Sequence, residues 1–154
     1  MAEKEPSLEA VSLLLEASNN ALKNAELCFR EKRFDATVRE AILTIENAAN
    51  AFILSLGGAY VSSHYEYRRA METVAQRRWK VLLKRPSFKA MLEAADLPRS
   101  SVAYRYPIAV VEGKIQIRRP PNEGEAKELL TSAQAFLKNA RKYIEEHKGR
   151  SLIG

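Results

Sequence analysis

The chain of 154 residues has the length of one ordinary domain and can bury a substantial core. Its 46% apolar and 29% charged residues are typical of a globular protein and exclude a disordered chain. Apolar runs fall short of the roughly 20 residues that span a bilayer, and the charged N-terminus lacks the apolar core of a signal peptide. Cys28 is the only cysteine, which excludes an intrachain disulfide and a thiolate zinc cluster. We therefore expect a cytoplasmic protein with no metal, no cofactor and no membrane association.

The net charge of +6 is concentrated in one part of the chain. The segment from His64 to Lys89 contains eight basic residues and only two acidic ones, Glu66 and Glu72, so its net charge is 8 − 2 = +6. The basic and acidic residues outside this segment are equal in number and cancel. The basic residues are Arg68, Arg69, Arg77, Arg78, Lys80, Lys84, Arg85 and Lys89. A protein that is neutral apart from one basic element suggests an anionic partner.

Two long amphipathic helices open the chain. Ser7 is a suitable cap for a helix that runs to about Lys32, and its broad apolar stripe predicts contact with more than one neighbour, including a second subunit. Asp35 can cap a second helix that ends at Gly57–Gly58. Because the link between them is short, these helices should lie antiparallel.

The middle of the chain predicts a third long helix and a short one. Ser62 or Ser63 begins the third helix, which runs from about His64 to Arg85 and is stopped by Pro86. A brief helix from Ser87 to Ala95 follows.

The last third of the chain predicts a hairpin and a final helix. The segments 108–111 and 114–117 flank Glu112–Gly113, a suitable two-residue turn, and a hairpin alone is marginal, so it should pack on the bundle or on a partner. Asn122 with Glu125 forms a capping box for a helix to about His147, followed by a loose tail. The fold class is therefore all-α: an antiparallel up-and-down four-helix bundle with a short extra helix and a small β-hairpin insertion before the last helix. It forms a single domain, 1–154, with its core at about 8–148.

Several segments resemble HEPN domains in their order along the chain. These are the charged aromatic turn at 29–36, the alanine-rich stretch around a glutamate at 46–51, the Gly57–Gly58 break, His64, and the Arg–aromatic–proline stretch at 104–107. The resemblance covers about 8–148, and Asn50 stands where the family usually has lysine.

The HEPN proteins that the chain resembles fall into two classes by function. Some HEPN proteins are metal-independent ribonucleases with an arginine, four to six residues and a histidine. Others bind nucleotides or RNA, often as partner of a small nucleotidyltransferase in a toxin–antitoxin-type pair. The resemblance implies a homodimer, and it leaves open a binding protein, a ribonuclease toxin or a non-catalytic helical scaffold.

Arg141 and His147 have the spacing of the ribonuclease motif. The histidine would move a proton while the arginine holds phosphate. On a continuous helix, however, residues six apart point roughly 120° away from each other, so they converge only if the helix breaks before His147. The structural alternative is that His147 and Lys148 complement the negative end of the helix dipole.

The basic third helix supplies the binding candidates, namely Arg69, Arg77, Lys80 and Lys84. Trp79, between two basic residues, is either a surface on which a nucleotide base stacks or an anchor against the short helix. Glu46 on the second helix is expected to pair with an arginine of the third.

Two further groups of residues extend the candidate binding surface. In Tyr104, Arg105 and Tyr106, the arginine can hold a phosphate while a ring stacks on a base, or the tyrosines fix the hairpin to the bundle. His64 either lines a phosphate site or packs against the second helix.

Overall fold

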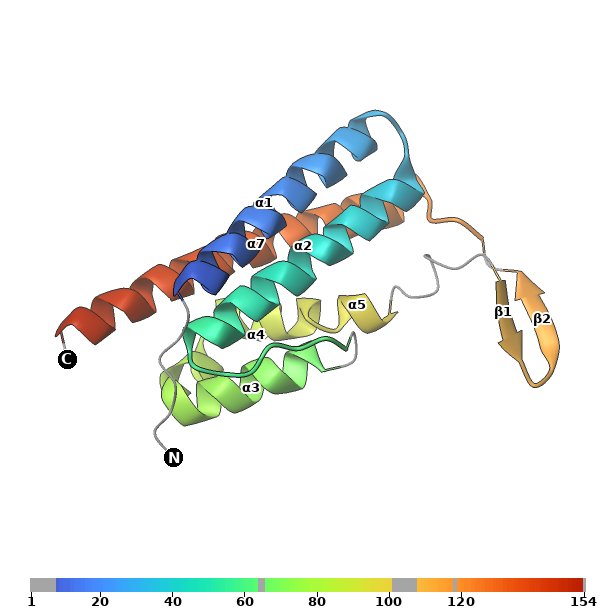
Figure 1. The fold of residues 1–154 in the computed structure, drawn as a ribbon. Coiled ribbons are helices and arrows are strands. Elements are labelled where there is room, and N and C mark those ends of the chain that lie inside the picture. Colours follow the sequence, from blue (N-terminus) through green and yellow to red (C-terminus); the bar gives the residue numbers. More distant parts are fainter. Residues whose placement is uncertain (1–7, 64–65, 101–107, 118, 154) are drawn as a thin grey trace.

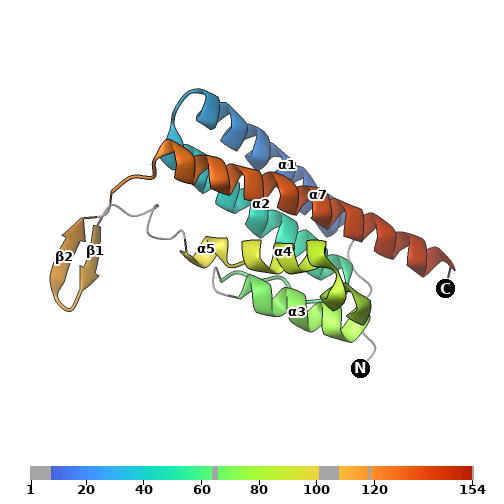
Figure 2. The ribbon, with the colours of Figure 1, turned by 180° about the vertical axis from the view of Figure 1, so that it is seen from behind.

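The computed structural model describes residues 8–63, 66–100, 108–117 and 119–153, and confirms the all-α class with a hairpin inserted before the last helix (Figure 1). Its elements in chain order are α1 (Leu8–Arg30), α2 (Phe34–Ser55), α3 (Tyr67–Arg78), the 3₁₀ helix η1 (Lys80–Lys84), α4 (Pro86–Ala94), α5 (Leu97–Ser100), β1 (Ile108–Val111), β2 (Lys114–Ile117) and α7 (Glu123–Ile153). Along the bundle, α1, α2, α4 and α7 alternate in direction, while α3 runs in the same direction as α2 (Figures 1 and 2). The predicted cap Ser7 lies outside the described residues.

The helices α1 and α2 form the antiparallel pair that the short link predicted. At the turn between them Phe29 packs against Phe34 in a tilted arrangement, with ring centroids 5.9 Å apart. Midway along the pair, the buried hydroxyl of Ser18 donates to the backbone carbonyl of Thr44 at 2.7 Å. The cap of α2 was predicted wrongly: Arg33 holds that position, and Asp35 lies in the first turn, 3.8 Å from Arg39.

The centre of the bundle is α2, which packs against α1, α3 and α7. The view from behind shows α7 crossing the bundle on the side opposite α3 (Figure 2). Because α1 packs on both α2 and α7, the predicted contact of its broad apolar stripe with more than one neighbour is confirmed within a single chain. The largest fully buried side chains come from α2, α3, η1, α4 and α7: Tyr143, Phe52, Phe88, Phe136, Ile42, Ile45, Ile53, Met71, Leu82, Met91, Ile144 and Val38.

The predicted third helix from His64 to Arg85 is wrong in its length. The helix α3 begins after Glu66 and ends at Arg78, where Trp79 adopts φ −155° and ψ 65° and the chain continues as η1. Pro86 begins α4 instead of merely ending the previous helix, since its missing N–H and fixed φ suit the first helical turn. The short helix α5 was not predicted.

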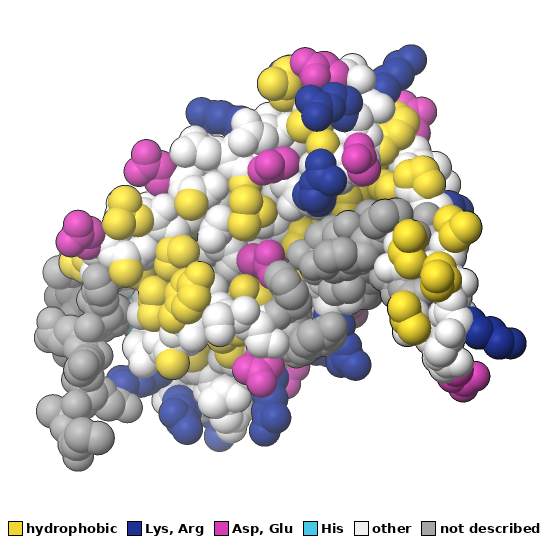
Figure 3. Space-filling model, turned by 45° about the vertical axis from the view of Figure 1, so that its right-hand side comes forward, with side chains coloured by type: hydrophobic (Ala, Val, Ile, Leu, Met, Phe, Trp, Pro, Cys, Tyr) yellow, Lys and Arg dark blue, Asp and Glu magenta, His cyan; other side chains and the backbone are white. Residues whose placement is uncertain are grey.

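The hairpin has the predicted strands and turn. Glu112 and Gly113 have φ of 51° and 76°, the left-handed values that a two-residue turn of this kind needs. Strand register pairs Ile108 with Ile117 and Val110 with Ile115, so these four side chains share one face. Their exposed fractions of 57%, 87%, 72% and 71% show that the bundle does not cover them, and hydrophobic side chains gather on the projecting hairpin (Figure 3).

The last helix starts as predicted and ends later. The side chain of Asn122 accepts from the backbone N–H of Glu125, and the carboxylate of Glu125 accepts from the N–H of Asn122, which is a capping box. The helix continues to Ile153, so the predicted loose tail after Lys148 is wrong. His147 therefore lies before the last turn, and its predicted role at the helix end is also wrong.

Candidate functional site

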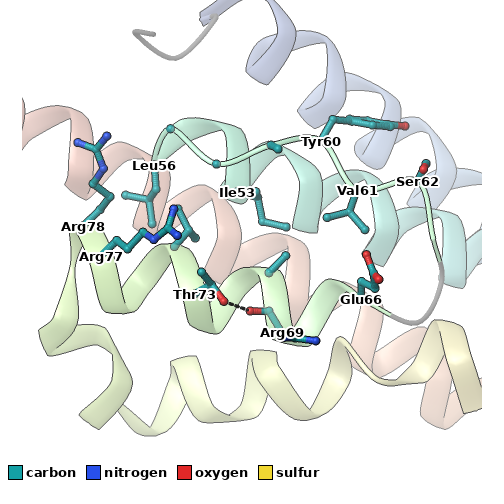
Figure 4. Close-up of a pocket in the computed structure, with 15 residues that line it drawn as sticks. Ile53, Leu56, Tyr60, Val61, Ser62, Glu66, Arg69, Thr73, Arg77 and Arg78 are labelled. Atoms are coloured by element: carbon teal, nitrogen blue, oxygen red, sulfur yellow. Dashed lines mark hydrogen bonds between the residues drawn. The ribbon is translucent and has the colours of Figure 1, made fainter. Parts of the chain in front are cut away.

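A groove of about 460 Å³ lies between α3 and the segment 57–62 that connects it to α2 (Figure 4). Its floor is formed by apolar side chains that include Ile53, Leu56 and Val74. Polar and charged side chains stand around this floor: Ser62, Glu66, Arg69, Thr73, Arg77 and Arg78. A concave site of this volume with an apolar floor and a few polar groups has the size and composition of a small-ligand site.

Two glycines fix the wall of the groove where α2 ends. Gly57 has φ +83° and donates to the carbonyl of Leu54, and Gly58 donates to the carbonyl of Ile53, which together make a Schellman motif. A Cβ on Gly58 would lie 2.7 Å from a side-chain methyl of Ile53. The chain can therefore turn back along the bundle only because these two positions carry no side chain.

Asn50 holds the far end of the same wall. Its buried side-chain amide donates to the backbone carbonyl of Val61 at 2.9 Å and accepts from the N–H of Val61 at 2.8 Å. The hydroxyl of Tyr67 also donates to that carbonyl at 3.4 Å, and burial, followed by the negative charge of Glu46, raises the pKa of Tyr67. The groove wall is thus fixed at both ends before any ligand arrives. The pairing of Glu46 with an arginine of α3 stays a prediction.

The rim of the groove carries opposite charges at its two ends. Arg77 and Arg78 lie at the C-terminal end of α3, beside the Gly57 turn, whereas Glu66 precedes α3 and lies beside Ser62 (Figure 4). Arg69 stands between them along the helix, where its backbone carbonyl accepts from the hydroxyl of Thr73. Three arginines against one glutamate make the groove positive overall.

Part of the charge excess is compensated by ion pairs, two of which are with acids that are distant in sequence. Arg68 pairs with Glu72 at 3.1 Å and with Asp96 at 2.7 Å. Arg85 forms a two-pronged pair with Glu146, which raises the pKa of Arg85. By contrast, no ion pair among the described residues involves the predicted binding side chains, Arg69, Arg77, Lys80 and Lys84.

The structure separates these four residues into two groups. Arg69 and Arg77 line the groove, whereas Lys80 and Lys84 are exposed on η1, beyond the break at Trp79. Lys and Arg side chains line the lower edge of the molecule, where α3 lies (Figure 3). The predicted binding residues are therefore divided between arginines that line the groove and exposed lysines on η1.

Trp79 is an anchor and is not available to stack on a base. Only 3% of it is exposed, and its ring meets that of Tyr143 edge-on with centroids 5.9 Å apart. Arg85 and Arg150 lie over its ring, 5.4 and 4.8 Å from the centroid. The predicted role as an anchor is confirmed, with the ring contacts made to Tyr143 and His147 of α7.

Comparison with known protein families gives a match to the HEPN domain over residues 11–147. The chain belongs to the HEPN family. Comparison with curated proteins gives no match. Membership of the HEPN family indicates a function related to nucleotides or RNA. In the described part of the chain, no helix is long and apolar enough to cross a membrane, and no cluster of three or more potential metal ligands occurs.

This HEPN domain does not bring Arg141 and His147 together. Helix α7 is continuous through both residues, so the break that would let them converge does not occur and their side chains leave the helix roughly 120° apart. His147 packs on Trp79 with ring centroids 5.8 Å apart. Burial first, and then the positive charges of Arg150 and Arg78, lower the pKa of His147.

The remaining candidates, His64, Tyr104, Arg105 and Tyr106, lie outside the described residues. Sequence reasoning missed Glu66 and Ser62 as groove residues, because nothing local shows that the 57–62 segment folds back over α3. Asn50 carried a signal: a polar residue within the buried face of α2 needs a hydrogen-bonding partner.

Proposed function

We propose that this HEPN protein binds a nucleotide or single-stranded RNA through the groove and the exposed lysines of η1. The observation that carries the proposal is the groove between α3 and the 57–62 segment, whose wall is preformed and whose arginines make it positive. An anionic ligand would gain from these cations without breaking ion pairs of Arg69 or Arg77.

The shape of the surface favours single strands over a duplex. A groove of about 460 Å³ admits one nucleotide, and Lys80 and Lys84 beyond it can contact the phosphates of the adjoining chain. Proteins recognise double-stranded RNA mainly by the shape of its wide minor groove. A duplex is too wide to enter the protein's groove and would contact only the side chains on its rim.

Reversing the charge of Arg77, Lys80 and Lys84 together to glutamate should weaken binding of a labelled single-stranded RNA by at least about tenfold at low salt. Removing three phosphate contacts should also reduce the slope of log affinity against log salt by about two. Fluorescence anisotropy titrations at several salt concentrations measure both quantities.

The matched control reverses Lys23, Lys127 and Lys138, which are exposed on α1 and α7 and change the net charge equally. If both triple variants lose the same affinity, binding depends only on net charge and the proposed surface is wrong. Failure of the unmodified protein to bind RNA or a nucleotide at low salt would contradict the function itself.

Homodimer formation, as the family resemblance implies, is part of the same proposal. Leu13 and Leu27 are 58% and 46% exposed on α1 and lie about 40° apart around the helix axis, so they present one apolar side to a second copy. Light scattering should give the mass of a dimer, and changing both leucines to arginine should give a monomer. Val81→Arg, at another exposed apolar position, should leave the dimer intact; a monomeric unmodified chain contradicts the proposal.

Pairing with a small nucleotidyltransferase rests on the family alone. A gene for such an enzyme beside the gene for this chain would support it. The ribonuclease alternative has no geometric support, because α7 holds Arg141 and His147 apart.

A further inference from the structure

The two ends of the groove offer different chemistry. At one end, the guanidinium of Arg78 lies 3.6 Å from the position that a Cβ on Gly57 would take, and Arg77 lies beside it. At the other end are the carboxylate of Glu66 and the hydroxyl of Ser62 (Figure 4). A ligand that spans the groove must therefore be anionic at one end and rich in hydrogen-bond donors at the other.

This polarity fixes how a nucleotide would lie. Phosphate is attracted by Arg77 and Arg78 and repelled by Glu66, so it occupies the arginine end. The 11 residue steps from Glu66 to Arg77 cover about 16 Å along the helix axis, and both side chains reach inward from the rim. That leaves room for a sugar over the apolar floor and a base at the glutamate end.

The carboxylate at that end discriminates among bases. An ionised carboxylate only accepts hydrogen bonds. The Watson–Crick edge of guanine presents two adjacent donors, the ring N–H and the exocyclic amino group, which match the two oxygens of Glu66. Adenine and cytosine each place a ring-nitrogen acceptor beside their amino group, and uracil flanks its single N–H with two carbonyl acceptors, so each meets the carboxylate with a repulsive contact.

We propose that the groove binds one guanine nucleotide, with its phosphate held by Arg77 and Arg78 and its base read by Glu66. This inference rests on the proposed nucleotide- or RNA-binding function and specifies its ligand. A guanosine monophosphate, or a guanylate at the end of an RNA strand, is the unit that fits.

Calorimetric titration of the full chain with GMP, AMP and inorganic phosphate tests the assignment. GMP should bind about tenfold more tightly than AMP, which corresponds to one good two-pronged base contact, and inorganic phosphate should bind more weakly than either. In Glu66→Gln the preference should fall to about threefold or less, because an amide donates as well as accepts. Arg77→Glu should weaken GMP and AMP by similar factors.

Glu66 is exposed, so its replacement should not affect folding, and Glu128→Gln on the exposed side of α7 serves as the matched control. Equal binding of GMP and AMP, a preference unchanged in Glu66→Gln, or phosphate binding as tightly as GMP would each overturn the assignment. If the guanine assignment fails but charge reversal of Arg77, Lys80 and Lys84 still weakens RNA binding, the proposed function stands without the guanine assignment. If neither RNA nor any nucleotide binds, both fail.

Discussion

Replacing Trp79 with alanine is expected to lower the free energy of unfolding by about 3–5 kcal/mol, the cost of removing a large buried aromatic side chain. The ring is 3% exposed and joins η1 to α7 through Tyr143 and His147. Its removal also takes away the surface over which Arg85 and Arg150 lie. Urea unfolding followed by circular dichroism measures the change.

Trp79→Phe should recover part of the lost stability, since a smaller ring still fills much of the site. Tyr60→Ala removes an aromatic side chain that is 60% exposed and should cost little. A Trp79→Ala variant of unchanged stability that has lost RNA binding would show that the tryptophan acts as a stacking surface and would contradict its packing against α7.

Changing Asn50 to alanine is expected to cost about 2–3 kcal/mol, because the backbone N–H and carbonyl of Val61 lose a buried partner. Alanine's better helix propensity offsets only about 0.5 kcal/mol. For a chain of this size the melting temperature should fall by about 5–10 °C, as differential scanning calorimetry measures. Nucleotide affinity should also fall, since the released wall no longer shapes the groove.

Asn20→Ala, at an exposed position of α1, is the control for asparagine replacement and should be nearly neutral. Asn50→Asp keeps the acceptor but loses the amide donor and buries a charge, so it should be at least as destabilising as alanine. If Asn50→Ala melts at the temperature of the unmodified chain, the two hydrogen bonds to Val61 do not hold the wall.

The sequence predicts best those elements whose determinants are local. The hairpin turn at Glu112–Gly113 and the capping box at Asn122 and Glu125 are set by residues within a few positions of one another, and both form as expected. The break at Trp79 is different, because the indole at the break packs against Tyr143 and His147, which lie far along the chain on α7. Burying the indole against Tyr143 favours a bend that no propensity within 67–85 indicates.

The same distinction applies to the groove. Positive charge at Arg69 and Arg77 is visible in the sequence. Arg68, however, pairs not only with the nearby Glu72 but also with Asp96, 28 residues away, and the partner of Arg85 is Glu146, 61 residues away. Only the fold shows which cations are already paired. The acidic end of the groove could not be predicted either. Glu66 becomes a groove residue only because the 57–62 segment, which Asn50 holds through Val61, lies along α3.

The capping box has a consequence for what the bundle tolerates. Asn122 and Glu125 form the cap that starts α7, and Arg119 binds the same carboxylate at 2.6 Å. Because these three residues all follow the hairpin, the start of the final helix does not depend on the hairpin residues. Lengthening such an insertion adds little to the entropy of closing the loop, about 0.6 kcal/mol for each doubling. The tip of the hairpin at Gly113, where a Cβ would meet nothing within 4 Å, is therefore a permissive place to graft a peptide tag or a fluorophore without disturbing the groove.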